Sequence, residues 1–252
     1  MPFQCNDFDQ ISIVLEMALF RGFCSVLMLL QVALTIALVH AQDDQSGFIS
    51  IDCGITEGSK YTDNKTGINY VSDAGFIDSG INQEILSTFN TDTLDFQLST
   101  LRSFPQNTRN CYTLKPGQGK GNRFMIRARF AYGNYDFKGQ PPQFDLYLGN
   151  DHWSRVLFNV SLAIDYEIIH LTSSDYIYVC LVNIGLGFPF ISALELRLLD
   201  STMYADDNEL RSLFLHARTN FGTSETIRLA YKLFYQIYLC LTLDIIRLCY
   251  KP

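Results

Sequence analysis

Two alternating runs of apolar residues, joined by a loop rich in glycine, asparagine, proline and aromatic residues, make up residues 123–149. In the first run every second residue from 124 to 130 is apolar, and Arg123, Arg127 and Arg129 fall between them. A period of two places alternate side chains on opposite faces of a β-strand, whereas a helix would scatter them. The pattern predicts two half-buried β-strands whose shared inner face consists of Phe124, Ile126, Ala128, Phe130, Phe144, Leu146 and Leu148.

The connection between these strands, residues 132–142 (YGNYDFKGQPP), is too long for a tight hairpin. Its aromatic and polar side chains are of the kinds that a sugar or peptide site on a loop uses. We therefore expect any function to lie at this end of the sheet.

Further short runs with strand character are separated by turn residues. Residues 54–80, in contrast, are rich in Gly, Asp, Asn and Ser with little periodicity, which predicts a long loop-rich segment. A series of short strands with turns between them predicts an all-β sandwich. The remaining predicted strands are 48–53, 96–104, 111–114, 153–158, 176–182 and 194–198.

An uncharged stretch of 18 residues, 22–39, follows Arg21 near the N-terminus. Val39 and Ala41 place apolar or small residues at the two positions that a signal peptidase inspects, so we predict that residues 1–41 contain a signal peptide cleaved after Ala41. Starting at Met17 would provide the usual short positive leading region. The alternative is a signal anchor or transmembrane helix, for which 18 residues is barely long enough.

Two glycosylation sequons support export, one at Asn64 (Asn-Lys-Thr) and one at Asn159 (Asn-Val-Ser). Both lie in polar, loop-like surroundings. We expect a protein of the secretory pathway that is extracellular or on the cell surface, with glycans at Asn64 and Asn159.

Five cysteines follow the predicted cleavage site, and pairing is expected in an oxidising compartment. The odd number means that at least one thiol stays free or pairs between molecules, and the wide spacing disfavours a zinc site. The five are Cys53, Cys111, Cys180, Cys240 and Cys249, and the first three are the disulfide candidates of the strand series.

Several functional classes have no signal in the sequence. The net charge of -7 and the lack of a basic run argue against nucleic acid. The histidines are isolated and no nucleophile turn occurs, so we expect no enzyme and no catalytic residues. The glycine-rich turn 116–121 lacks phosphate-loop spacing and leads into a strand, and the acidic residues of 206–209 lack the pattern of a calcium loop. Neither a cofactor nor a metal is therefore expected.

Nine ordered motifs within residues 48–197 resemble the malectin-like ectodomain of plant leucine-rich-repeat receptor kinases. The resemblance implies a jelly-roll-like β-sandwich of the malectin type, outside the cell and ahead of leucine-rich repeats, a membrane span and a kinase. The motifs are residues 50–54 (SIDCG), 67–73 (GINYVSD), 101–105 (LRSFP), 109–114 (RNCYTL), 126–128 (IRA), 132–136 (YGNYD), 144–149 (FDLYLG), 179–183 (VCLVN) and 190–197 (FISALELR).

The family carries two malectin units in tandem, and this chain resembles the first. We expect the malectin-like sandwich at 48–200 and a linker toward a second unit at 201–228. The tail 229–252 is apolar and resembles nothing in the family, and its longest uncharged run is too short to span a membrane. It is interpreted as non-native sequence in a truncated or mis-spliced gene product, with a membrane-surface amphipathic helix as the alternative. A non-functional truncated gene product is accordingly one alternative for the function.

The resemblance also indicates candidate ligand-binding residues. Animal malectin holds a glucose disaccharide through aromatic residues and an acid, and Tyr70, Tyr132 and Tyr135 match aromatic positions. An aromatic face suits the apolar face of a sugar, and Asp136 can accept hydroxyl hydrogen bonds. The later loop 185–190 has no carboxylate, which weakens the case for the same ligand. The alternative is that these tyrosines pack structurally.

Two functions follow from the sequence. The first is an extracellular carbohydrate-binding module for cell-wall or glycoprotein glycans, and the second is an interaction module for a peptide or co-receptor of a signalling receptor. An exposed aromatic platform in a groove would favour sugar, and a filled loop end with an apolar rim would favour protein. Membrane association is expected if residues 22–39 are retained, or through the tail.

Overall fold

The computed structural model describes Met28, Gln31 and residues 45–158, 162–201, 203–204, 212–217 and 247–250. By its contacts the chain divides into residues 1–44 and residues 45–252, and the fold below is that of the second unit. The predicted signal peptide, Asn159 and most of the linker and tail lie outside the described residues, so those interpretations remain predictions. No helix within the described ranges has the length and apolar character to cross a membrane.

Short strands account for about half of the described residues of this unit. Two 3-10 helices, η1 (Asp73–Gly75) and η2 (Phe96–Leu98), interrupt them. The strands are β1 (Ile49–Asp52), β2 (Lys60–Thr62), β3 (Asn69–Ser72), β4 (Ile81–Glu84), β5 (Thr100–Ser103), β6 (Arg109–Leu114), β7 (Arg123–Ala131), β8 (Gln143–Leu148), β9 (Asp151–Val156), β10 (Ala163–Leu171), β11 (Ile177–Leu186), β12 (Phe190–Ile191), β13 (Ala193–Leu198), β14 (Leu213–Ala217) and β15 (Arg247–Tyr250).

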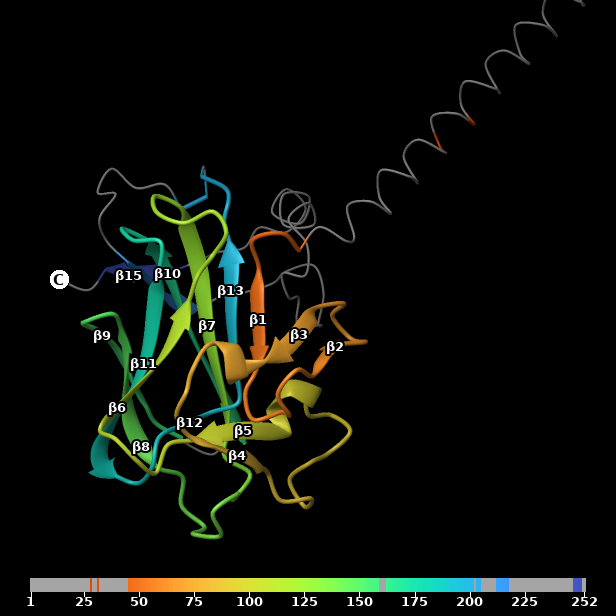
Figure 1. The fold of residues 1–252 in the computed structure, drawn as a ribbon, viewed down its shortest axis with the longest axis vertical. Coiled ribbons are helices and arrows are strands. Elements are labelled where there is room, and N and C mark those ends of the chain that lie inside the picture. The colour runs from red at the N-terminus through yellow and green to blue at the C-terminus, as the bar shows by residue number, and fades with distance from the viewer. Residues whose placement is uncertain are drawn as a thin grey trace, which may run out of the picture. The chain divides into compact units, whose positions relative to one another are not determined.

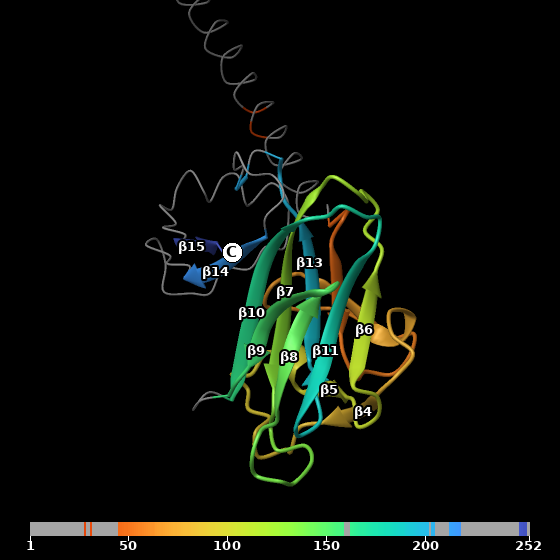
Figure 2. The same cartoon turned by 90° about the vertical axis from the view of Figure 1, so that its left-hand side faces the viewer.

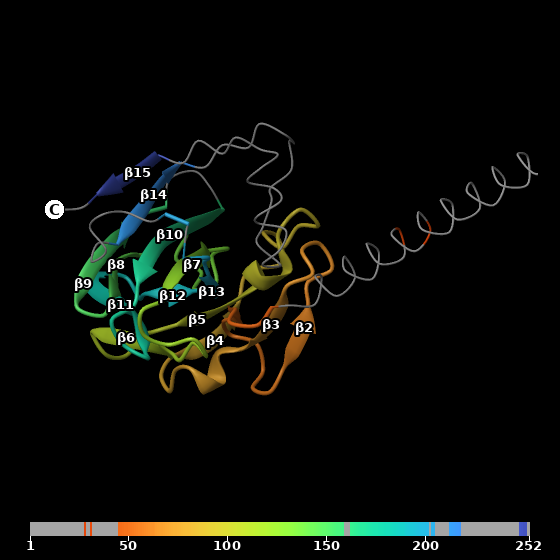
Figure 3. The same ribbon diagram turned by 90° about the horizontal axis from the view of Figure 1, so that it is seen from above.

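Two large sheets face each other, as the predicted sandwich requires (Figure 2). Among the described residues the eight-stranded sheet has the order β15-β14-β10-β7-β13-β1-β3-β2, and the four-stranded sheet has the order β6-β11-β8-β9. A three-stranded sheet, β12-β5-β4, lies near the lower end in Figure 1. Figures 1 and 3 place β2 and β3 on the side of the molecule away from β9. The all-β sandwich predicted from the alternating runs is confirmed.

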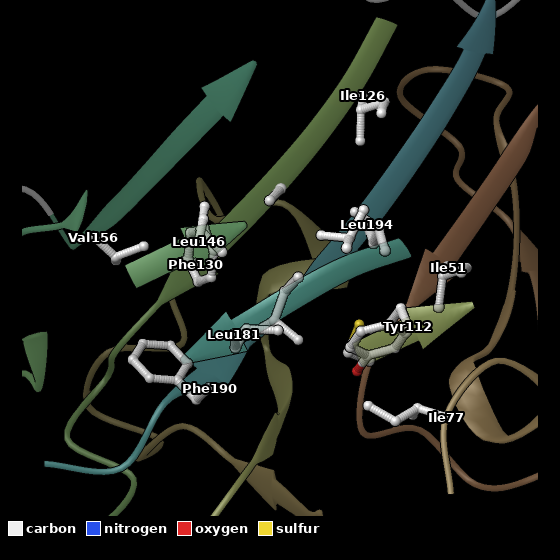
Figure 4. Close-up of a cluster of buried hydrophobic side chains, with 14 of the residues drawn as sticks. Ile51, Ile77, Tyr112, Ile126, Phe130, Leu146, Val156, Leu181, Phe190 and Leu194 are labelled. Atoms are coloured by element: carbon white, nitrogen blue, oxygen red, sulfur yellow. The ribbon is translucent and has the colours of Figure 1, made fainter. Parts of the chain in front are cut away.

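The core lies between the two large sheets, around the residues of β7 and β8. All seven residues predicted for the inner face are buried there, with exposed fractions of 6% or less. The Phe130 ring lies 5.7 Å from that of Phe144 and 6.1 Å from that of Phe190. Figure 4 shows Phe130 and Phe190 within this cluster, together with Leu146 and Leu181. The period of two thus predicted the inner face correctly.

The prediction that β7 is half-buried is wrong, because its outer face is buried as well. Arg127 and Arg129 are 5% and 4% exposed. Each guanidinium is paired with carboxylates from other segments. Arg127 lies between Glu167 on β10 and Glu195 on β13, its register partners on the two neighbouring strands. A charge is tolerated in the interior when it is paired and hydrogen-bonded. We call these paired groups the outer-face charge network; its members are Arg127, Arg129, Asp95, Asp165, Glu167, Glu195 and Arg197.

Three further elements differ from the sequence-based expectation. The segment predicted as a loop, residues 54–80, contains β2, β3 and η1, and β3 pairs with β1 in parallel. The predicted strand 96–104 starts as η2 and becomes a strand from Thr100. The long strand β10 was not predicted. Whether such a segment forms a strand depends on the neighbours that it pairs with, and local propensity does not encode them; β10, for example, pairs with β7 and β14.

The disulfide candidates separate into one pair and one free thiol. Cys111 on β6 and Cys180 on β11 are register partners and form a disulfide that links positions 69 residues apart. Cys53 is a buried free thiol, because it lies in the core at the end of β1 rather than opposite another cysteine. At the other end of the chain, β15 pairs with β14, so residues 247–250 of the tail have strand backbone rather than the irregular structure expected.

Asp52 gives a pH-dependent contribution to stability. Its carboxylate, on β1, is fully buried and accepts hydrogen bonds from Tyr61 Oη (2.7 Å) and Thr100 Oγ1 (2.9 Å). Burial raises the pKa of Asp52 to about 7, and the negative charge of Asp73 adds to this rise, while the two hydroxyl donors oppose it. The folded protein therefore holds this proton more tightly than the unfolded chain does.

The linkage predicts that this contribution is fully present below the unfolded pKa of about 4 and is lost as the pH rises through about 7. Between pH 4.5 and 7.5, the unfolding free energy of the natural chain should include a fall due to Asp52. In Asp52→Asn this fall should be absent, so the change over the interval should differ between the two proteins by roughly 2 to 4 kcal/mol. Urea titrations at several pH values measure the difference. If the unfolding free energies of the two proteins changed with pH in the same way, Asp52 would not be the group that binds the proton on folding.

Candidate functional site at the loop end

The loop between β7 and β8, residues 132–142, forms the lower end of the molecule in Figures 1 and 2. Its start is held against the β4 side, where the Leu86 amide donates to the Gly133 carbonyl at 2.9 Å. Gly133 has a φ of +43°, and a Cβ atom there would stand 2.3 Å from Cβ of Ile85. A glycine is required at this close approach. The loop predicted to carry function is thus fixed at its base.

Tyr132 and Tyr135, two of the candidate ligand residues, point into the protein. Each is 8% exposed, and their rings meet edge to face at 5.6 Å. Both rings also pack on Phe190, at 6.2 and 5.3 Å. Burial raises the pKa of both hydroxyl groups well above its usual range. The two tyrosines close the end of the sandwich and leave no exposed aromatic platform.

Asp136, the candidate acid, is used within the loop. It accepts a hydrogen bond from Tyr132 Oη at 2.5 Å and one from the Lys138 amide at 3.2 Å. The Lys138 ammonium lies 3.5 Å from the other carboxylate oxygen. The Asp136 side chain is 18% exposed, so one edge of its carboxylate faces solvent. These contacts fix the loop and leave limited room for a ligand hydroxyl.

Tyr70 lies outside this loop site. It is fully buried on β3, where its hydroxyl donates to Glu195 at 2.6 Å and accepts from Gln97 at 3.3 Å. Its ring stacks on Tyr61 at 5.5 Å. None of these partners belongs to the loop 132–142, and a ring without exposed surface cannot stack on a sugar. The structure therefore does not bring Tyr70 together with the other candidates, and its role in this fold is packing against the outer face of the eight-stranded sheet.

The structure instead presents an apolar rim that sequence reasoning missed. Phe137 is 77% exposed, Leu186 is 54% exposed and Phe188 is 41% exposed. The Lys138 ammonium lies 4.8 Å from the Phe188 ring centroid, which joins the β7–β8 loop to the β11–β12 connection. We call Phe137, Lys138, Leu186 and Phe188 the loop-end rim. The signal for this rim in the sequence is residues 185–190 (GLGFPF), a glycine- and proline-containing loop that carries Leu186 and Phe188.

The backbone at Phe137 supports a functional role for the loop-end rim. Its φ is +59°, a region that bulky residues rarely adopt. The Phe137 amide donates to the Asn134 carbonyl at 3.0 Å, which holds this turn. The result is a large aromatic ring directed into solvent at some conformational cost. Such an outlier motivates a hypothesis of function at this position.

Asn64, the first predicted glycosylation site, is among the described residues, whereas Asn159 lies outside them. Asn64 is exposed on the turn between β2 and β3. The Thr66 hydroxyl donates to the Asp63 carboxylate, which orders the turn. An exposed turn of this kind is accessible to a modifying enzyme. Glycosylation at Asn64 remains a prediction that the geometry permits. Nowhere in the described ranges do three potential His, Cys, Asp or Glu ligands gather around a metal position.

The chain is similar to plant receptor kinases and to their solved ectodomains. A family model described as the malectin-like domain matches residues 51–235, beyond the position 228 where the sequence resemblance was expected to end. The chain is 49% identical over 201 residues to a putative leucine-rich repeat receptor-like protein kinase of Arabidopsis thaliana, a match that covers 79% of this chain and 22% of the relative. It therefore spans about a fifth of the length of that curated relative.

Solved structures share the fold at low sequence identity. The ANX1 ectodomain from Arabidopsis thaliana matches with a TM-score of 0.57 and 16% identity, over 72% of this chain and 51% of the other. A crystal structure of the plant peptide RALF23 in complex with FER and LLG2 matches with a TM-score of 0.55 and 15% identity, over 70% and 49%. On the family-model match and the identity to the receptor kinase, this chain belongs to the malectin-like domain family, in the form found in the ectodomains of plant leucine-rich repeat receptor-like kinases.

Proposed function

We propose that this malectin-like domain is an extracellular protein-recognition module that binds a peptide or co-receptor through the loop-end rim. It has no enzymatic role in this proposal. The observation that carries it is the contrast between Tyr132 and Tyr135, which fill the loop end, and Phe137, which projects from it with 77% of its surface exposed. A filled end with an apolar rim suits a protein surface, because ligands such as sugars are bound in concave sites.

The chemistry of the rim fits a protein partner. Exposed large apolar side chains rimmed by polar groups mark interaction sites, and aromatic residues dominate the binding energy of such interfaces. Lys138 adds a cation that lies over the Phe188 ring and 3.5 Å from Asp136. The solved relative that contains FER, RALF23 and LLG2 supports the same class of function, since that ectodomain takes part in an assembly with a peptide and another protein.

Carbohydrate binding is the second candidate, and Asp136 is the feature that favours it. Part of its carboxylate faces solvent beside Tyr132. A sugar would have to hydrogen-bond to this edge without the usual stacking partner, because both tyrosine rings are internal. The two candidates therefore predict different sensitive residues, Phe137 for protein and Asp136 for sugar.

The experiment presents the full chain, secreted from a eukaryotic host, to a panel of plant extracellular peptides and receptor ectodomains and, in parallel, to a glycan array. We expect a peptide or protein ligand whose affinity falls at least about tenfold in Phe137→Ala, as for an interface hot spot. The matched control is Phe96→Ala, which removes a ring that is 60% exposed on η2. Glycan binding that depends on Asp136 but not on Phe137, without any protein ligand, would contradict the proposal and favour the second candidate.

A further inference from the structure

The outer face of the four-stranded sheet carries tyrosines that the loop-end function does not use. Tyr176 directly precedes β11 and Tyr178 is its second residue, so the two occupy alternate positions and project from the same face. They are 41% and 44% exposed, and their ring planes are within 20° of each other at a centroid distance of 6.4 Å. Tyr147 on β8 joins them, because it is the register partner of Cys180, two residues beyond Tyr178. Figure 2 looks onto this face, with β9, β8, β11 and β6 in its front layer.

Cations lie over two of these rings. The Lys115 ammonium is 5.4 Å from the ring centroid of Tyr176, and the Arg109 guanidinium is 5.0 Å from that of Tyr147. Arg109 also donates to the carbonyl of Gly149, which fixes it across the sheet. Among the ion pairs of the described residues, neither Lys115 nor Arg109 has a carboxylate partner. Their positive charge is therefore available to a ligand.

The balance of charge on this face is opposite to that of the whole chain. Asp145 shares the face, but its side chain is 9% exposed and is held by Arg155 at 2.7 Å. The Arg155 guanidinium lowers the pKa of Asp145, so this carboxylate stays ionised and paired. Arg155 itself is half exposed. Asp175, beside Tyr176, accepts from the Lys120 amide. Besides the Asp145–Arg155 pair, the exposed charged side chains over β6, β11 and β8 are thus the cations Arg109 and Lys115 and the carboxylate of Asp175, on a protein whose net charge is -7.

The face is also rigid. The Cys111–Cys180 disulfide joins β6 to β11 in the middle of it, and β11 pairs with β8 along the other side. Tyrosine and arginine on a fixed flat surface lose little conformational entropy on binding, and they are the residues that contribute most at protein interfaces. Opposite charge then selects the partner and speeds its association.

We propose that the outer face of the four-stranded sheet, formed by Arg109, Lys115, Tyr147, Tyr176 and Tyr178, docks an acidic segment of a partner protein. Its carboxylates pair with Lys115 and Arg109, and its apolar groups lie on the tyrosine rings. This surface is separate in sequence and in position from the loop-end rim, so it goes beyond the function proposed above and can be tested independently.

The test measures binding of the full secreted chain to a synthetic glutamate–tyrosine copolymer, with poly-lysine as the charge-reversed probe. We expect the copolymer to bind and poly-lysine not to bind at this face, with an affinity that falls as salt rises from about 0.05 to 0.5 M. Lys115→Glu and, separately, Tyr178→Ala should each weaken binding of the copolymer by tenfold or more. Thermal unfolding of each variant checks that it is folded, and Lys115 is an exposed residue whose replacement leaves the core intact.

The matched control is Lys60→Glu, which makes the same charge change at an exposed position on β2 of the other large sheet. It should leave copolymer binding within about twofold of the natural chain, which is the scatter of exposed charge effects. Equal losses in Lys60→Glu and Lys115→Glu would mean that net charge alone drives binding and would overturn the proposal. The proposal would also be overturned if polygalacturonate bound more tightly than the copolymer and lost this binding in Lys115→Glu. The face would then bind an acidic polysaccharide.

Discussion

Replacing Glu195 by alanine is expected to destabilise this domain by about 3 to 5 kcal/mol, as is typical when one member of a buried ion pair is removed. Glu195 has no exposed surface. Its carboxylate pairs with Arg127 at 3.2 Å and with Arg197 at 3.2 Å. Both arginines are themselves buried, and Tyr70 donates its hydroxyl to the same carboxylate. Without the carboxylate, Arg197 would lose its ion pair with Glu195, and Arg127 would keep Glu167 as its counter-charge, in a region from which water is largely excluded.

Urea unfolding of the variants measures this effect. Glu195→Gln keeps the shape and one oxygen acceptor, so it separates the loss of charge from the loss of packing, and we expect it to cost less than the alanine variant. Glu84→Ala removes an exposed carboxylate on β4 and should change the unfolding free energy by no more than about 0.5 kcal/mol. If Glu195→Ala were as mild as Glu84→Ala, the outer-face charge network would contribute nothing to stability.

The second large effect is expected at Phe130. Replacing it by alanine should cost roughly 3 to 5 kcal/mol, because the ring is fully buried and the surrounding sheets cannot close the cavity. Its ring contacts Phe144 and Phe190 from the four-stranded and three-stranded sheets and Tyr166 from β10. A loss of this ring also removes support from Phe190, on which the two loop tyrosines pack.

Chemical denaturation of Phe130→Ala beside Phe137→Ala tests this prediction. Phe137 has 77% of its surface exposed, so its replacement should change stability by less than about 0.5 kcal/mol. The pair compares the same chemical change inside the core and on the rim. A cost below about 1 kcal/mol for Phe130→Ala would show that the inner face does not form the core of the folded protein in solution.

Much of the candidate site could be placed from the sequence, but its character could not. The loop 132–142 was identified correctly as the connection at one end of the sandwich, since its length and composition are local properties. The direction of its aromatic side chains is not local. Tyr132 and Tyr135 turn inward because Phe190, more than fifty residues later, supplies the surface on which they pack. Phe137 lies in the turn that its amide closes on the Asn134 carbonyl, and it stays exposed.

The sequence by itself determined the strands β7 and β8 and their inner face, because alternation of apolar residues follows directly from the geometry of a strand. Its ordered motifs, by resemblance, indicated the family. Only the tertiary structure decided that the arginine side of β7 is buried. Arg127 pairs with Glu167 and Glu195, which lie 40 and 68 residues away in the chain. A period-two pattern states which residues share a face, but it does not state what covers that face. The cover comes from strands and loops whose positions depend on the whole fold, and the same holds for Tyr70 and for the exposed tyrosines of β11.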